Sequence, residues 1–155
     1  MQIRRGREAD TERLVALAGQ IFETEQEIPR ALTPLPPENR PQWWCVLDLV
    51  LGLLCIVGGV ALYWEDDAWH MGRFVISPEL RGRHVGTALL ETALTDIFAQ
   101  DIREVIMEAR DTTVHILKKF GAETTGAPFS FYRGTVTPMR LTREAFWNSH
   151  TGGQI

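Results

Sequence analysis

The stretch that decides the fold reads Val75-Ile-Ser-Pro-Glu-Leu-Arg-Gly-Arg-His-Val-Gly-Thr-Ala-Leu-Leu90. It begins as a short apolar run, breaks at Pro78, and opens an apolar helical pattern near Gly86. A strand that passes through a glycine-bearing turn into a helix leaves unpaired N–H groups at the helix N-terminus. Those donors and the positive end of the helix dipole suit a pyrophosphate. The stretch therefore predicts a phosphate-binding loop, with an ordinary strand-to-helix connection as the alternative.

The glycines and arginines of this loop have separate chemical uses. Gly82 and Gly86 let the main chain turn sharply and approach an anion without a side chain in the way. Arg81 and Arg83 can add charge-assisted hydrogen bonds to phosphate.

Length and composition indicate one globular domain. We expect residues 1–147 of the 155 to form it and residues 148–155 to be a loose tail. Hydrophobic residues make up 45% and charged residues 23%, as is typical of globular proteins. The net charge of −4 gives a nucleic-acid partner no electrostatic support.

Two further features concern the cellular setting. Cys45 and Cys55 lie in apolar runs without metal-ligand spacing, so we expect buried free thiols and no metal site. The first residues lack the apolar region of a signal peptide, which favours a cytoplasmic location.

The run Leu49–Trp64 contains no charged residue. A membrane-spanning helix needs about 20 apolar residues, so the run is close to that length. Three glycines divide it, and the pieces Trp44–Val50 and Leu53–Trp64 are rich in β-branched and aromatic residues. This pattern predicts two buried strands joined at a glycine turn, with a membrane helix as the alternative.

The remaining pattern mixes helices and strands, which predicts an α/β sheet with both parallel and antiparallel pairs. Strands are expected at Gln2–Arg4, Ala68–Ser77, Arg103–Ala109, Ala122–Thr125 and Phe129–Leu141, the last two being closing strands around Gly134. Helices are expected from an N-cap at Asp10 through Phe22, after Gly86 to before Asp101, over Thr112–Phe120, and in a short turn around Glu38–Gln42.

Three segments resemble one protein family. Arg81-Gly-Arg-His-Val-Gly86 resembles the coenzyme A loop of the GCN5-related N-acetyltransferases (GNAT), Gln/Arg-x-x-Gly-x-Gly/Ala. Leu117-Lys-Lys-Phe-Gly121 is similar to the family's Tyr-x-Lys-Leu/Phe-Gly-Phe segment, and Phe22-Glu-Thr-Glu-Gln-Glu-Ile-Pro29 to the Phe-x-x-Glu-Gln-x-x-Pro segment of one bacterial subgroup. The resemblance spans roughly Met1 to Leu141.

The resemblance implies a fold and a cofactor. The fold is a central mixed sheet of six to seven strands with about four helices, and the cofactor is acetyl-CoA or another acyl-CoA. The pantetheine is expected along the backbone of one strand, between two parallel strands that splay apart. The implied cofactor-binding residues are Phe74, Val75, Ile76, Arg81, Gly82, Arg83, His84, Val85, Gly86, Thr87 and Arg110. For His84 a surface turn residue is the alternative, and for Thr87 a role in the first helical turn.

The same resemblance suggests residues for the chemistry. Acetyl transfer needs a base for the amine and benefits from an acid for the thiolate. The family's acid is a tyrosine where this chain has Leu117, which leaves Thr113 one turn earlier and Tyr132 as hydroxyls. The candidate bases are Glu25 and Glu27, with Glu108 and His70 as further possibilities, and the candidate substrate contacts are Gln26, Glu27 and Thr137. A solvated helix end is the alternative for the glutamates at 25 and 27.

We therefore expect an acyl-CoA-dependent N-acyltransferase acting on a primary amine of a small molecule or a protein. A module of the same fold that binds acetyl-CoA or a protein partner without turnover is the alternative, because Leu117 and Thr137 depart from the family pattern. The tryptophans, among them Trp43, Trp44, Trp64 and Trp69, fit an acyl pocket, a homodimer surface or a membrane interface.

Overall fold

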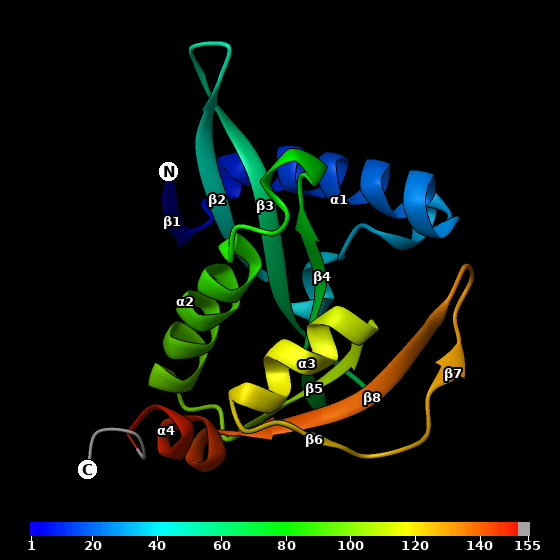
Figure 1. Ribbon diagram of the computed structural model, residues 1–155, viewed down its shortest axis with the longest axis vertical. Coiled ribbons are helices and arrows are strands. Elements are labelled where there is room, and N and C mark those ends of the chain that lie inside the picture. The colour runs from blue at the N-terminus through cyan, green and yellow to red at the C-terminus, as the bar shows by residue number, and fades with distance from the viewer. Residues whose placement is uncertain (152–155) are drawn as a thin grey trace.

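One mixed sheet organises the chain, and a computed structural model describes it over residues 1–151. Within these residues the strand order is β1-β2-β3-β4-β5-β8-β6, with β7 paired to β8 (Figure 1). The strands are β1 (Gln2–Arg5), β2 (Gln42–Val50), β3 (Leu53–Glu65), β4 (Ala68–Ile76), β5 (Glu104–Ala109), β6 (Glu123–Thr124), β7 (Phe129–Ser130) and β8 (Thr135–Thr142). The helices are α1 (Thr11–Gln26), α2 (Val85–Ala99), α3 (Asp111–Lys119) and α4 (Arg143–Thr151).

The strand pair predicted from the apolar run Leu49–Trp64 is confirmed. β2 and β3 pair antiparallel through a turn at Leu51-Gly52, both with positive φ. The hairpin projects from the body of the molecule (Figure 1), and Leu51 at its tip is 99% exposed. None of the described helices is long and apolar enough to cross a bilayer.

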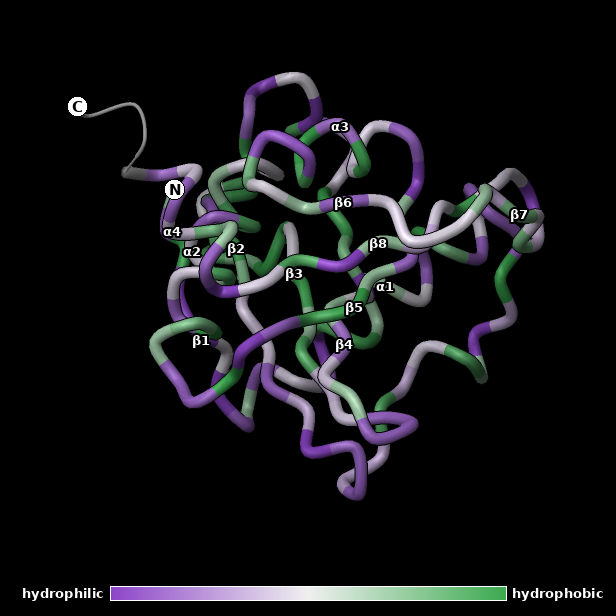
Figure 2. Tube along the Cα trace, turned by 90° about the horizontal axis from the view of Figure 1, so that it is seen from below, coloured by the Kyte–Doolittle hydropathy of each residue, from purple (hydrophilic) through white to green (hydrophobic). Residues whose placement is uncertain are grey.

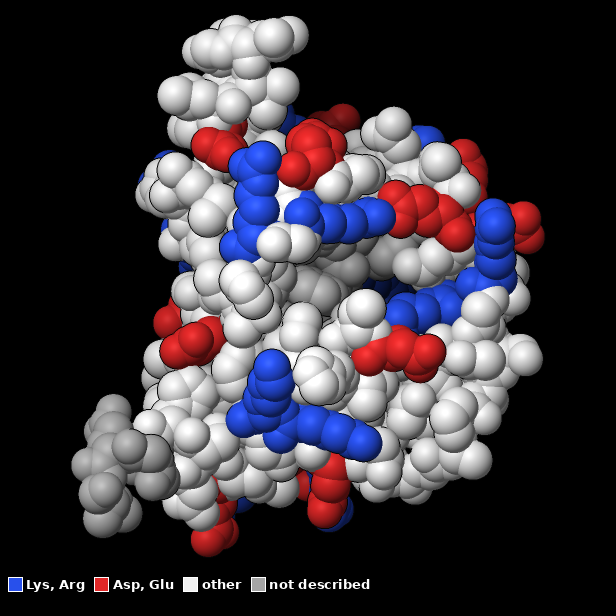
Figure 3. Space-filling model, in the orientation of Figure 1, with Lys and Arg blue, Asp and Glu red and all other residues white. Residues whose placement is uncertain are grey.

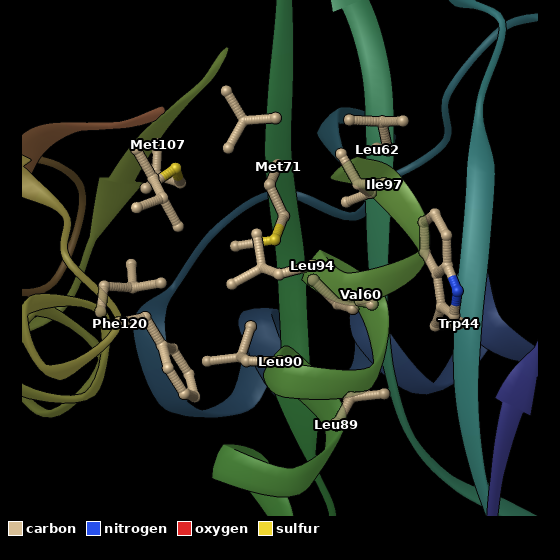
Figure 4. Packing of buried hydrophobic residues seen from close by; sticks show 14 of the residues in the cluster. Trp44, Val60, Leu62, Met71, Leu89, Leu90, Leu94, Ile97, Met107 and Phe120 are labelled. Atoms are coloured by element: carbon tan, nitrogen blue, oxygen red, sulfur yellow. The ribbon is translucent and has the colours of Figure 1, made fainter. Parts of the chain in front are cut away.

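Helices cover both faces of the sheet. α1 lies on one face, where Leu14 packs with Trp43 and Ala61. α2, α3 and α4 lie on the other, over the larger core cluster. Figure 4 shows this core between sheet and helix, with Val60, Leu62 and Met71 from the strands facing leucines of α2. In Figure 2 the hydrophilic stretches concentrate in the peripheral loops.

The predicted parallel pair is confirmed: β4 and β5 pair in parallel, and α2 connects them along the chain. The other pairs in the sheet are antiparallel. A helical crossover of this length is what a parallel pair requires. Gly121, with φ of +101°, ends α3 as the sequence predicts.

Several expectations need correction. Asp10 does not cap α1 with its side chain; it accepts hydrogen bonds from Arg4 Nη1 and Arg7 N instead. The turn expected at Glu38–Gln42 is a 3-10 turn over Pro37–Asn39, since Gln42 already belongs to β2.

The helix α4 was not predicted from the sequence. Residues 148–151 belong to this helix rather than to a loose tail, because Ser149 Oγ donates to Phe120 O and His150 stacks on the Phe120 ring. Residues 152–155 of the predicted tail lie outside the described residues.

Candidate acyl-transfer cleft

The candidate site is a split in the sheet between β4 and β5. These strands share only the pair His70↔Ile106, and a cavity of about 450 Å³ opens beside it. Figure 3 shows the same face hollowed, with basic and acidic side chains on the rim. The cavity is lined from β3, β4, β5, α3 and the end of α1, including Tyr63, His70, Gly72, Arg73, Phe74, Glu108, Thr113, Leu117 and Gln26.

A β-bulge in β4 lies at this split. Gly59 pairs with Val75 and Ala61 with Gly72, so Val60 alone opposes both Arg73 and Phe74. Arg73, one of the two bulged residues, has a positive φ of +52°. The bulge thus redirects the β4 backbone where it leaves β5.

Arg73 also holds the loop around Leu32 and Thr33 against the cleft by hydrogen bonds. Its guanidinium donates from Nε to Thr33 O (3.2 Å) and from Nη2 to Leu32 O (3.0 Å). The same group lies 4.9 Å from the centre of the Tyr63 ring. Arg73, Tyr63 and the loop residues therefore form one wall on the α1 face.

The predicted phosphate loop connects β4 to α2. Gly82 has φ of +80° with open space around it, and His84 takes a left-handed conformation (φ +61°) at the start of α2. Gly86 lies against Phe74, because a Cβ there would fall 2.9 Å from Phe74 Cζ. The loop therefore needs glycine at one position for its turn and at another for close packing.

The other cofactor candidates divide between surface and core. Arg83 and His84 are exposed and Thr87 is half-buried at the first turn of α2, whereas Val85 is buried. Val75 packs against α1 and Ile76 into the main core, so their side chains point away from the cleft and only their backbone can serve a ligand.

Arg81 is engaged by Glu25. The guanidinium donates to both carboxylate oxygens of Glu25, at 2.8 and 3.0 Å, and from Nε to Ile76 O. The structure thus brings Glu25 to the predicted phosphate loop, whereas Glu25 does not line the cleft cavity. A base role for Glu25 does not follow from this geometry.

The remaining sequence candidates fall inside and outside the cleft. Glu108, His70 and Gln26 line the cavity, whereas Glu27, Tyr132 and Thr137 do not. Tyr132 is 50% exposed on the β7–β8 turn. Arg110 lines the cavity, and it donates to Phe131 O and Arg133 O, which ties that turn to the mouth of the cleft.

Leu117 is fully buried where the cavity meets α3, and Thr113 lines it one turn earlier. His115 is exposed on another side of α3.

Tyr63 also lines the cavity, and the sequence pattern did not indicate it as a site residue. Burial raises the pKa of its phenol, with Arg73 opposing and the carboxylates of Glu65 and Glu108 reinforcing the shift. Tyr63 lies within an apolar run, which predicts a buried strand residue rather than a site residue. Strand alternation places it on the same face as Ala61, opposite the core-facing Leu62.

Comparison with known proteins agrees with this geometry. A family model described as an Acetyltransferase (GNAT) domain matches residues 54–143, which is more than half of the chain. No curated protein matches the chain.

Solved structures share the fold at low identity. A Lactobacillus plantarum protein assigned as an N-acetyltransferase is 16% identical with a TM-score of 0.74, covering 91% of this chain and 97% of that one. The spermidine N-acetyltransferase of Vibrio cholerae, solved with CoA and spermine, is 17% identical with a TM-score of 0.69, covering 95% and 98%. Tetrahymena GCN5 is 15% identical with a TM-score of 0.67, covering 92% and 96%.

The family model, the mixed sheet with its split parallel pair, and the glycine-bearing loop before α2 together place this chain in the GNAT family of acetyltransferases.

Proposed function

We propose that this chain transfers an acetyl group from acetyl-CoA to a primary amine of a small molecule or protein by direct attack. The observation that carries the proposal is the cleft between β4 and β5, whose polar cavity is lined by Phe74, the residue against which Gly86 of the loop before α2 packs. The Vibrio cholerae enzyme of this fold, solved with CoA and spermine, supports both the cofactor and the amine class.

The residues of the cofactor loop fit a coenzyme diphosphate. A 15-residue helix begins at Val85, and its first N–H groups and dipole favour an anion. Gly82 leaves the loop backbone open, and the exposed Arg83 adds a positive charge. Bound there, acetyl-CoA would supply the thioester, and the β4 backbone at Phe74–Ile76 would receive the pantetheine.

Glu108 is the proposed base on the amine side. It lies near the end of β5 and lines the cavity, and its pairing with Pro138 of β8 fixes its position in the strand. A carboxylate there can take the proton that the amine must lose. A leaving thiol with an ordinary pKa of about 8.5 does not require an acid, so Leu117 is compatible with turnover.

Gln26 is proposed to contact the acceptor. It belongs to the segment Phe22–Pro29 and lines the cleft, which supports a contact with the acceptor. Glu27 and Thr137 do not line the cavity and are not part of this proposal.

The direct experiment follows thiol release from acetyl-CoA with four amines: spermidine, 2-phenylethylamine, a lysine blocked at its α-amine, and a peptide with a free N-terminal alanine. We expect release that depends on at least one amine, with the acetylated amine detected by mass spectrometry. Arg83→Glu should raise the KM for acetyl-CoA and is the control for the cofactor loop. Absence of amine-dependent release with all four would contradict the proposal.

The second candidate is a module that binds acetyl-CoA without turnover. Leu117, where the family has its tyrosine acid, is the observation that favours it. Calorimetric binding of acetyl-CoA without amine-dependent thiol release would decide for this candidate.

A further inference from the structure

Tyr63 places a phenol beside the split between β4 and β5. It lies on β3 opposite His70, on the α1 face of the sheet, and lines the cleft cavity. Its ring stacks on the His70 imidazole at 5.5 Å, and the Arg73 guanidinium lies 4.9 Å from its centre. Two neighbours therefore hold the ring in one orientation.

Gly72 makes room for the hydroxyl. A Cβ on Gly72 would fall 3.2 Å from Tyr63 Oη and 3.4 Å from its Cε1, so the phenol end lies directly over the Gly72 backbone. Gly72 is the residue just before the Arg73–Phe74 bulge, where β4 turns away from β5. The hydroxyl thus lies at the edge of the opening.

The surrounding charges suit an amine. The carboxylates of Glu65 and Glu108 lie near enough to Tyr63 to influence its pKa, and both residues line the cavity. Because burial keeps the phenol protonated, its oxygen stays a neutral hydrogen-bond acceptor through the physiological range.

We propose that the Tyr63 hydroxyl binds the acceptor nitrogen and directs it toward the thioester carbon at the β4 bulge. The assignment rests on the function proposed above. The phenol oxygen accepts one N–H of the amine, and Gly72 permits the hydroxyl to lie within reach of that nitrogen.

The step balances without a proton from Tyr63. The nitrogen lone pair forms the C–N bond, the C–S bond breaks with its electron pair on sulfur, and Glu108 takes the proton that nitrogen loses. Tyr63 therefore orients the nucleophile on the face opposite Leu117, and it does not replace the acid that Leu117 cannot supply.

Two substitutions test the assignment, measured with whichever of the four amines the wild-type chain acetylates fastest. Tyr63→Phe removes only the hydroxyl and should lower kcat/KM for the amine by about tenfold or more, with KM for acetyl-CoA unchanged. Gly72→Ala keeps the hydroxyl but displaces it, because the new Cβ would lie 3.2 Å from Tyr63 Oη. The backbone tolerates alanine there, since Gly72 has an ordinary φ. This substitution should produce a loss of the same kind.

The matched control is Tyr132→Phe, because the chain has only these two tyrosines and Tyr132 does not line the cavity. We expect wild-type kinetics from it, and thermal unfolding of each variant checks folding. If the wild-type chain acetylates an amine and Tyr63→Phe has the same kcat/KM for that amine, the Tyr63 assignment is wrong but the proposed function is not. No turnover by the wild-type chain would overturn the proposed function, and the Tyr63 assignment with it.

Discussion

At the scale of single residues, two of the glutamates proposed from the sequence as bases have different surroundings. Glu108 lines the cavity, whereas Glu25 pairs with Arg81 beside the cofactor loop. Their substitutions should therefore change different kinetic constants.

Glu108→Gln should lower kcat by about a hundredfold, because the amide cannot take the proton of the amine. Steady-state rates across pH measure this, and raising the pH should recover part of the loss as free amine accumulates. Glu104→Gln on the same strand is the control, since Glu104 does not line the cavity. Equal rates for Glu108→Gln and the control would show that the proton leaves by another route.

Glu25→Gln should raise the KM for acetyl-CoA about two- to fivefold and leave kcat unchanged, because a partly exposed ion pair that holds Arg81 contributes little more than that. Glu23→Gln, which loses only an exposed contact with Arg30, is the matched control. A hundredfold fall in kcat for Glu25→Gln would instead identify Glu25 as the base.

The backbone geometry of the loop before α2 could be predicted from the sequence better than the residues that line the cleft cavity. Gly82, His84 and Gly86 act through local backbone geometry, which a short motif records. Tyr63 reaches the cleft only through the β3–β4 register and the bulge at Arg73, and neither can be read from neighbouring residues.

At the scale of elements, the β2–β3 hairpin contains a residue in an unfavourable conformation. Leu51 has φ of +51° and Gly52 φ of +80°, values typical of a type I′ turn, which prefers Asn-Gly. Leu51→Asn should therefore increase the free energy of unfolding by about 0.5–1 kcal/mol.

Urea denaturation measures this change. Leu53→Asn makes the same chemical change at an exposed strand position and should give no gain. Equal stabilisation by both substitutions would show that lost apolar exposure, rather than turn geometry, is the cause.

The start of α1 should confer a pH dependence on stability. Arg4 lowers the pKa of Asp10 by a side-chain hydrogen bond, and the Arg7 N–H adds to the effect. A lowered pKa in the folded state stabilises the protein above the unfolded pKa of about 3.9, and this contribution is lost as the pH falls through the folded value.

Asp10→Asn should therefore reduce the free energy of unfolding by about 1–2 kcal/mol at pH 7, with a smaller difference from wild type at about pH 3, below the unfolded pKa. Urea titrations at the two pH values measure it. A difference that persists unchanged in acid would mean that the carboxylate charge is not responsible.

The helix α4 shows why the last element could not be predicted. It follows β8 without an intervening turn, and its start depends on Thr142, whose Oγ1 accepts from Ala145 N. Its apolar residue Phe146 is fully buried against Phe98 and Phe120, contacts that join distant parts of the chain.

At the scale of the whole molecule, the mixed sheet with α2 between parallel strands could be predicted because each strand and helix has a local pattern. The cavity could not, since it arises from a bulge and from the missing hydrogen-bonded pairs beyond His70↔Ile106. Cytoplasmic location and a homodimer stay predictions from the sequence.

The most direct measurement is a crystal structure of the chain with acetyl-CoA. We expect the diphosphate against the backbone of residues 82–87 and the thioester between β4 and β5, next to Phe74. A diphosphate bound away from this loop, with the split between the strands filled by protein side chains, would show that the cofactor does not bind as proposed.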